Sequence, residues 1–342
     1  MERLLSSGGL RYPAFRVVKA GSQVPLAEYT TDLSWRPKPF TGTADPERVA
    51  SAFADGATIV LQALHHNWLP LARFSRALEA ELGHPVQANS YYTPSRSQGF
   101  AVHHDTHDVF VLQVDGEKRW LVYDPVLELP LKHQRWSNEL GEPGPVVLDV
   151  TLRAGDTLYL PRGWLHEALT SESDSLHITV GVVVYAWIDA LRAALDECER
   201  DLEFRRSVPA DGEAEVDLVG LLAERLGSED VAARMRRRFV ERRRPILEGQ
   251  LAEMRALESI DAETLLERRP TVLAQLAGTT LVFEGKKVVF PEAARAELEA
   301  VAGADGPFCA ADLPGELDAE GRLVLVRRLI REGFLRRSAV AA

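Results

Sequence analysis

Three residues of the sequence have the types and spacing of a metal-binding group. His103 and Asp105 are two positions apart, so their side chains point to the same side wherever the backbone is extended. His166 follows Asp105 by 61 residues, just beyond a Pro and Gly turn that ends an apolar run. Two imidazoles and one carboxylate occupy three sites of an octahedral ion and leave three open. This pattern suits non-haem Fe(II) that handles a bidentate co-substrate and dioxygen, and we predict such a site here.

The alternative is a chance arrangement, because the sequence contains nine histidines. His104, His107, His133 and His177 compete for any such role, and a histidine two residues before an aspartate is common by chance. Context favours the metal site. His103 and His166 each lie beside an apolar strand of one predicted β module, so their convergence at the mouth of a barrel is geometrically reasonable.

A co-substrate with two carboxylates also needs a cation or several hydrogen-bond donors inside an apolar barrel, because an unpaired charge is costly to bury. Lys118 and Arg119 begin the strand that follows an Asp-Gly dipeptide, and strand alternation alone leaves open which of them faces inward. The alternative is that both are solvated. Asn89 and Tyr91, again two positions apart, can supply amide and phenol donors to the same pocket. Without a metal site, Tyr91 would be interpreted as a core aromatic.

Two helices are predicted before the β module. Asp45 followed by Pro46 is typical of an N-cap and a first helical residue, and the helix is expected to run toward Phe53. From residue 69 to residue 82 apolar side chains recur at helical spacing, and Gly83 ends the pattern. A short buried strand is expected between these helices, at residues 57–61.

Between residues 86 and 184 the apolar period changes to two, which predicts an all-β module of the sandwich or small barrel type. The clearest expected hairpin joins residues 108–114 to residues 118–123 through Asp115 and Gly116, because Asp-Gly between apolar strands is a strong turn signal.

After residue 186 the apolar pattern is helical, and helices are expected at 188–202, 216–226 and 231–257. Residues 271–337 alternate short strands with helices, which predicts a small winged-helix-like domain.

Composition limits the class of protein. The 342 residues are 46% hydrophobic and 27% charged, which predicts packed domains and excludes a wholly disordered chain. The formal net charge of −11 argues against nucleic acid as the default partner. Two cysteines are too few for a disulfide scaffold, and no run of about 18 apolar residues is present. Together with an N-terminus that lacks a secretory pattern, these features predict a cytoplasmic protein with no membrane span.

Several motif blocks in order resemble the JmjC-type ribosomal oxygenase family, which are cupin-like Fe(II)- and 2-oxoglutarate-dependent protein hydroxylases. The dense match runs from Asn89 to Val184. The blocks are Asn89-Ser90-Tyr91-Tyr92-Thr93-Pro94, Ser97-Gln98-Gly99-Phe100, His103-His104-Asp105, the run from Asp108 to Trp120, and Leu160-Pro161-Arg162-Gly163-Trp164-Leu165-His166-Glu167-Ala168.

The resemblance implies a role for individual residues. It implies that His103, Asp105 and His166 bind Fe(II). It also implies that Lys118, rather than Arg119, pairs with the distal carboxylate of 2-oxoglutarate as co-substrate. Further cofactor-binding residues implied by it are Asn89, Tyr91 and, on a late strand, Thr179.

The resemblance also implies an architecture and a partner. We expect a double-stranded β-helix (JmjC/cupin-like) catalytic domain at residues 1–185, a helical, dimerising region at 186–269 and a winged-helix-like domain at 270–342. The implied function is hydroxylation of an Arg or His side chain of a ribosomal protein by a homodimer. Two alternatives stay open, namely the same chemistry on a peptide natural product or small molecule, and a non-enzymatic cupin-like binding protein. The motifs specify iron and co-substrate but not the target.

Overall fold

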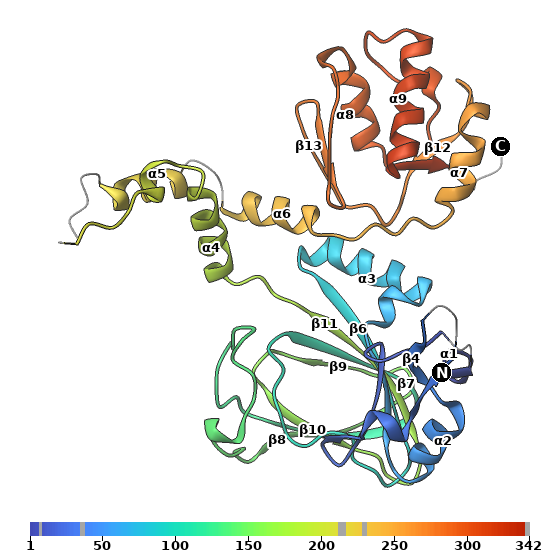
Figure 1. Ribbon diagram of the computed structural model, residues 1–342, viewed down its shortest axis with the longest axis vertical. Coiled ribbons are helices and arrows are strands. Elements are labelled where there is room, and N and C mark those ends of the chain that lie inside the picture. The colour runs from blue at the N-terminus through green and yellow to red at the C-terminus, as the bar shows by residue number, and fades with distance from the viewer. Residues whose placement is uncertain (7–8, 35–37, 211–216, 228–230, 339–342) are drawn as a thin grey trace. The chain divides into compact units, whose positions relative to one another are not determined.

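The computed structural model describes residues 1–6, 9–34, 38–210, 217–227 and 231–338 (Figure 1). The chain forms two compact units, one of Met1–Glu79 with His84–Val184 and one of Ala80–Gly83 with Tyr185–Ala342. The predicted boundary between residues 269 and 270, inside the second unit, stays a prediction. Among the described residues no helix is long and apolar enough to cross a membrane.

The first unit is a curled antiparallel sheet with helices on its outside, drawn in blue to green in Figure 1. Its helices are α1 (Glu2–Ser6), α2 (Pro46–Ala54) and α3 (Leu69–Leu82). Its strands are β1 (Phe15–Lys19), β2 (Ser22–Gln23), β3 (Thr30–Leu33), β4 (Phe40–Ala44), β5 (Thr58–Leu61), β6 (Val86–Thr93), β7 (Asp108–Tyr123), β8 (Val146–Arg153), β9 (Thr157–Leu160), β10 (Leu165–Leu169) and β11 (Ser175–Val182).

The predicted helix starts are confirmed. The Asp45 carboxylate accepts a hydrogen bond from the Arg48 N–H at 3.2 Å, and Pro46 opens α2. Helix α3 spans the predicted residues and is followed by Gly83, whose φ of +68° is the left-handed conformation of a helix C-cap. Its buried Glu79 accepts from the backbone N–H of Val86 at 2.9 Å, which fixes the start of β6.

Strand β7 joins two faces of the barrel. Its first half pairs with β9 and β11, and its second half pairs with β8 and β10. The predicted hairpin at Asp115 and Gly116 is therefore wrong, because the chain continues in the same direction through this point as one strand. Gly116 has a φ of +62°, and a Cβ on it would lie 1.9 Å from the carbonyl oxygen of Asp174. The glycine permits a bend between two sheets, not a reversal.

The interior of the barrel is filled by alternate residues of these strands. Val109, Val111, Trp120, Val122 and Leu152 form one buried cluster. The order β10-β7-β11-β6-β5-β1-β2 then places the N-terminal strands β1 and β2 at the far edge. This is the antiparallel architecture expected of a double-stranded β-helix.

The second unit contains six helices and five strands among its described residues, drawn in yellow-green to red in Figure 1. They are α4 (Trp187–Cys198), α5 (Leu218–Gly227), α6 (Val231–Glu241), α7 (Gln250–Ala256), β12 (Leu266–Arg268), β13 (Ala274–Ala277), β14 (Thr280–Phe283), β15 (Lys286–Val289), α8 (Arg295–Gly303), α9 (Ala319–Glu332) and β16 (Leu335–Arg337). The single helical stretch expected at 231–257 is two helices, because Pro245 lies between them and cannot continue a helix.

Strands β13, β14 and β15 form a meander, β12 pairs with β16, and α8 and α9 supply much of the core around Leu298, Val326 and Leu329. The winged-helix description of this region stays a prediction. In the helical region α6 packs on α4. Two of the four arginines of α6 form ion pairs with α4, namely Arg234 with Glu197 at 3.2 Å and Arg238 with Asp196 at 3.0 Å.

Candidate active site

The predicted ligand residues lie on two segments that are joined by backbone hydrogen bonds. The N–H of His103 donates to the carbonyl of His166 at 3.1 Å, and the N–H of His166 donates to the carbonyl of His103 at 2.8 Å. The N–H of Gly163 donates to the carbonyl of Asp105 at 3.0 Å. These three bonds hold the turn before β10 against the segment before β7, so residues 61 positions apart meet.

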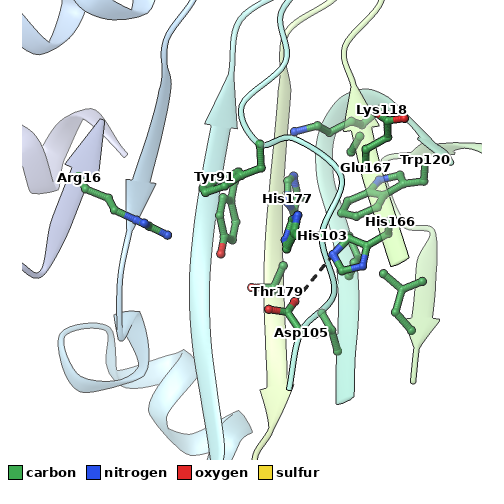
Figure 2. A pocket seen from close by; sticks show the side chains of 15 residues that line it. Arg16, Tyr91, His103, Asp105, Lys118, Trp120, His166, Glu167, His177 and Thr179 are labelled. Carbon is green, nitrogen blue, oxygen red and sulfur yellow. Dashed lines mark ion pairs between the residues drawn. The ribbon is translucent and has the colours of Figure 1, made fainter. Parts of the chain in front are cut away.

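The side chains of His103, Asp105 and His166 form one group. One nitrogen or oxygen from each lies within 4.8 Å of those of the other two, and Nε2 of His166 is 3.8 Å from the Asp105 carboxylate (Figure 2). Among the described residues this is the one group of three His, Cys, Asp or Glu side chains with that property. Its donor set of two nitrogens and one oxygen fits a divalent transition metal.

Both histidines present the same nitrogen to the group. Nδ1 of His103 is 2.8 Å from the carbonyl of Ala101, and Nδ1 of His166 is 3.1 Å from the carbonyl of Trp164. A carbonyl only accepts, so a neutral imidazole here carries its proton on Nδ1 and leaves the Nε2 lone pair free for a metal. Burial, followed by the neighbouring His103, lowers the pKa of His166 to about 4, which keeps this ring neutral at physiological pH.

The group lies on the wall of a cavity of about 230 Å³ inside the barrel. Lys118 enters this cavity from the second half of β7 and is only 4% exposed. Its Nζ donates to Thr93 Oγ1 at 3.0 Å, and no carboxylate of the described residues lies within ion-pair distance of it. Burial lowers the pKa of Lys118 to about 7. Arg119 instead pairs on the surface with Asp149 at 2.6 and 2.7 Å, so the choice left open by alternation is resolved by burial.

A row of side chains lies beside Lys118 on neighbouring strands. Tyr91 of β6 is directly opposite His177 of β11, and their rings stack at 4.9 Å with an angle of 5°. His177 also meets Trp120 edge-on at 5.5 Å. Burial, followed by the charge of Lys118, lowers the pKa of His177 well below its usual value. His177 is therefore a neutral ring in the cavity wall.

Of the other residues predicted to bind the co-substrate, Thr179 and Tyr91 line the cavity and Asn89 is not among the described lining residues. Thr179 lines the cavity and is opposite Asn89 on β6. Asn89 is not among the described cavity-lining residues, and its Oδ1 accepts from the N–H of Ala63 at 3.0 Å. Burial, followed by the charge of Asp105, raises the pKa of Tyr91, so its phenol stays protonated as a donor.

The other candidate histidines lie outside the described cavity lining. Nε2 of His104 is 3.1 Å from the carbonyl of Gln134, and Nε2 of His107 is 2.8 Å from Nε2 of Gln87.

Two residues of the site were not predicted from the sequence. Thr93 continues the alternation of Asn89 and Tyr91 and could have been found from it. Arg16 is a charged residue within the apolar strand β1, and its place in the cavity needs the long-range pairing of β1 with β5.

Residues 63–189, which carry every predicted ligand, match the JmjC domain family. Over part of its length the chain is similar to proteins named ribosomal oxygenases. It is 34% identical over 206 residues to Ribosomal oxygenase 1 of Gallus gallus. This match covers 57% of this chain and 34% of that protein. It is 42% identical over 135 residues to the bifunctional lysine-specific demethylase and histidyl-hydroxylase NO66 of Drosophila persimilis. This match covers 37% of this chain and 19% of that protein.

The match to each of these relatives thus spans about a third or less of the relative's own length. The fold is shared with YcfD, a ribosomal oxygenase from Escherichia coli solved in complex with cobalt and 2-oxoglutarate. The TM-score is 0.56 at 18% identity, covering 98% of this chain and 89% of YcfD. The expected JmjC/cupin-like fold is therefore confirmed.

Proposed function

We propose that the protein is an Fe(II)- and 2-oxoglutarate-dependent oxygenase that hydroxylates a side chain, Arg or His, of a ribosomal protein. The observation that carries this proposal is Lys118, a buried amine without a carboxylate partner among the described residues, in the same cavity as the His103, Asp105 and His166 group. A buried amine is costly unless something pairs with it, and a co-substrate carboxylate is that partner. The names of the relatives support the choice of reaction.

His103, Asp105 and His166 would hold the iron, and Lys118 with Thr93 would hold the distal carboxylate of 2-oxoglutarate. Bound iron supplies the activation of dioxygen that the side chains themselves lack. In the overall reaction a substrate C–H, O₂ and 2-oxoglutarate give the C–OH, succinate and CO₂, with one oxygen atom in the alcohol and the other in succinate. We assign Tyr91 and Thr179 to the polar wall beside the co-substrate, and Asn89 to positioning that wall.

The chain's own residues would perform three tasks. The carbonyls of Ala101 and Trp164 hold the imidazole protons on Nδ1, so that no proton competes for Nε2. Lys118 takes up a proton when a carboxylate arrives, because its pKa of about 7 leaves it mostly neutral in mildly alkaline solution. The stacked rings of Tyr91 and His177, with Trp120, exclude water from the space around the bound carboxylate.

Intact-mass spectrometry of the ribosomal proteins from the source organism, with and without the gene, tests this function. We expect one protein to lose about 16 Da on deletion and to regain it on complementation with the wild-type gene. If no ribosomal protein changes mass, the substrate assignment is wrong and a peptide or small molecule takes its place. If the purified protein also releases no succinate with any extract, a non-enzymatic role of the barrel is indicated.

We further propose a cytoplasmic homodimer. Helix α4 supports it, because Trp187, Leu191 and Leu195 are 76%, 41% and 49% exposed and stand at positions i, i+4 and i+8, on one face of the helix. An exposed apolar stripe of this kind is typical of a protein interface. Light scattering of the purified protein tests this proposal.

A further inference from the structure

Strand β15 forms an open edge of the small sheet in the second unit. It pairs with β14, and no other described strand pairs with it. The N–H of Phe290 donates to the carbonyl of Thr279 at 2.9 Å, so these two residues are a hydrogen-bonded pair at the end of the ladder. Bonded and non-bonded pairs alternate along an antiparallel ladder. The N–H and C=O groups of Lys287 and Val289 therefore point away from β14, and no hydrogen bond among the described residues satisfies them.

The open edge lies beside a groove that is closed on its other side by helix α9, drawn in red in Figure 1. Val288, Val289 and Phe290 line this groove, whose volume is about 520 Å³. The helix contributes one of its faces, with side chains at positions i, i+3, i+4 and i+7, namely Val324, Arg327, Arg328 and Arg331. The adjacent face of α9, with Val326 and Leu329, lies in the core. This β15 groove is thus apolar along the strand and basic along the helix.

The β15 groove has an excess of positive charge. Three arginines and one glutamate line it. The glutamate, Glu258, is 3.9 Å from Arg327. Arg328 is 2.8 Å from Glu332, which is not among the described lining residues. The side chain of Arg331 is exposed and has no ion pair among the described residues, so it can bind a carboxylate from outside the chain.

Two lysines of β15 add to this charge. Lys286 shares Glu332 with Arg328, at a distance of 3.3 Å. Lys287 is exposed and has no ion pair within the described part of the chain. Counting the groove lining, the strand and their ion-pair partners, three arginines and two lysines stand against two glutamates. The edge is therefore locally basic, although the whole chain has a net charge of −11.

We propose that the β15 groove binds an extended acidic segment of a partner protein, which adds a strand to the open edge. The main chain of the segment bonds to the outward groups of Lys287 and Val289, and its carboxylates pair with Arg331. In strand addition the main-chain bonds give affinity, and the side chains at alternate positions give specificity. This inference does not rest on the proposed function, because the described linings of the groove and of the barrel cavity share no residue.

Two other occupants suit the groove less well. A second copy of β15 would place lysines beside lysines, and like charges on facing strands are destabilising. A nucleic acid would pair with the arginines, but its backbone carries no row of N–H donors for the outward C=O groups of the strand. An acidic peptide satisfies the arginines and both kinds of main-chain group.

Fluorescence polarisation with the full-length protein tests the inference. The labelled probes are a peptide of three Glu-Val repeats, a matched peptide of three Lys-Val repeats and a short single-stranded RNA. We expect the acidic peptide to bind at least 10-fold more tightly than either other probe, and more weakly as salt rises. Tighter binding of the RNA assigns the surface to nucleic acid and overturns the inference. Equal binding of the two peptides, or binding of no probe, also overturns it, and the lysines then only protect the edge from aggregation.

Two N-methylated forms of the acidic peptide test whether its main chain is recognised. One form carries methyl groups on the glutamate nitrogens and the other on the valine nitrogens, so each loses the donors along one edge of the extended peptide. An added strand faces β15 with one edge only, so one form should bind at least 10-fold more weakly than the other. Equal affinity of the two forms indicates side-chain contact alone and overturns strand addition.

Two variants remove the two kinds of contact separately. Arg331→Glu reverses the unpaired charge and should weaken binding of the acidic peptide about fivefold or more. Val289→Pro removes an outward N–H and no bond to β14, which an edge strand tolerates, and should weaken binding about 10-fold. Arg255→Glu, at an exposed arginine of α7 outside the described groove lining, is the control and should bind as wild type. Wild-type affinity in either groove variant overturns the inference.

Hydrogen exchange of the wild type, followed by NMR, needs no substitution. Saturating acidic peptide should slow exchange of the N–H groups of Lys287 and Val289 at least 10-fold. The N–H of Val288 belongs to a bonded pair with β14, so its exchange should change little. Slowing at other residues without slowing at Lys287 and Val289 overturns the inference.

Discussion

His103 and His166 form a reciprocal backbone pair, in which the N–H of each donates to the carbonyl of the other at 3.1 and 2.8 Å. The pair joins the segment that precedes β7 to the start of β10, and the N–H of Gly163 adds a further bond by donating to the carbonyl of Asp105. The ligand geometry is thereby set by main-chain hydrogen bonds, which no side-chain substitution removes directly. Side-chain variants of this group therefore test ligand chemistry and not the fold.

Removal of one ligand should abolish tight metal binding. We expect His103→Ala, Asp105→Ala or His166→Ala to weaken Co(II) binding by about 100-fold or more, since even the loss of an outer-sphere partner costs 10- to 100-fold. Anaerobic titration followed by absorption spectroscopy measures this. His133→Ala, at an exposed histidine, is the matched control and should bind as wild type. Wild-type affinity in any of the three variants contradicts the ligand assignment.

Co-substrate binding should be accompanied by proton uptake at Lys118. With a pKa of about 7 the free amine is mostly neutral at pH 8. Pairing with a carboxylate raises this pKa, so binding of 2-oxoglutarate at pH 8 should take up about one proton. At pH 6 the amine is already protonated and the uptake should fall close to zero. Calorimetry of 2-oxoglutarate binding in buffers of different ionisation enthalpy measures this.

Two variants of Lys118 control for that experiment. Lys118→Arg keeps a permanent charge and should show no uptake at pH 8. Lys118→Ala should raise the half-saturation concentration of 2-oxoglutarate by about 30-fold or more, as is usual when one partner of a buried charge pair is removed. Uptake that persists in Lys118→Arg would assign the proton to another group.

The metal-free protein should lose stability in mild acid because of His177. The pKa of His177 is lowered in the folded state, so below pH 6.5 the unfolded chain binds a proton that the folded chain does not. The free energy of unfolding therefore falls as pH drops from 6.5. The slope of the unfolding free energy against pH gives the number of protons taken up on unfolding. His177→Phe should lower that number by about one, as measured by urea unfolding between pH 7 and 5. His133→Phe, at the exposed surface, should leave the slope unchanged.

The bend in β7 should depend on Gly116. Its missing Cβ would lie 1.9 Å from the Asp174 carbonyl oxygen, so Gly116→Ala should lower the free energy of unfolding by about 2 kcal/mol or more. Gly83 also has a positive φ, but nothing lies within 4 Å of its missing Cβ. Gly83→Ala should therefore lower the free energy of unfolding by only about 1 kcal/mol, the strain of a left-handed alanine. Urea unfolding of the two variants measures how much more the steric clash at Gly116 costs. Equal losses would contradict the close approach.

The stripe on α4 should hold a dimer together. We expect light scattering of the wild type to give twice the chain mass of 37.9 kDa, and Leu191→Glu with Leu195→Glu to give the single mass. A charge on each partner's stripe would be buried unpaired, which is costly. Val289→Glu, at an exposed valine of β15, is the control and should remain dimeric. A monomeric wild type would refute the dimer.

The sequence by itself determined the local features. Asp45, Pro46 and Gly83 predicted the ends of α2 and α3, because caps depend on neighbouring residues only. The spacing of His103 and Asp105, with the motif blocks around them, predicted the JmjC barrel and its candidate metal group. Alternation left Lys118 and Arg119 undecided, and the resemblance chose the residue that lies buried.

Only the tertiary structure decided which distant segments meet. Asp115 and Gly116 have the local chemistry of a hairpin turn, yet β7 continues through them with a bend and without a reversal, because it pairs with neighbouring strands on both sides of this point. Arg16 reaches the cavity because β1 pairs with β5, more than 40 positions away, and β5 in turn pairs with β6. Such pairings are selected by burial across the whole sheet, and no short stretch of sequence contains that information.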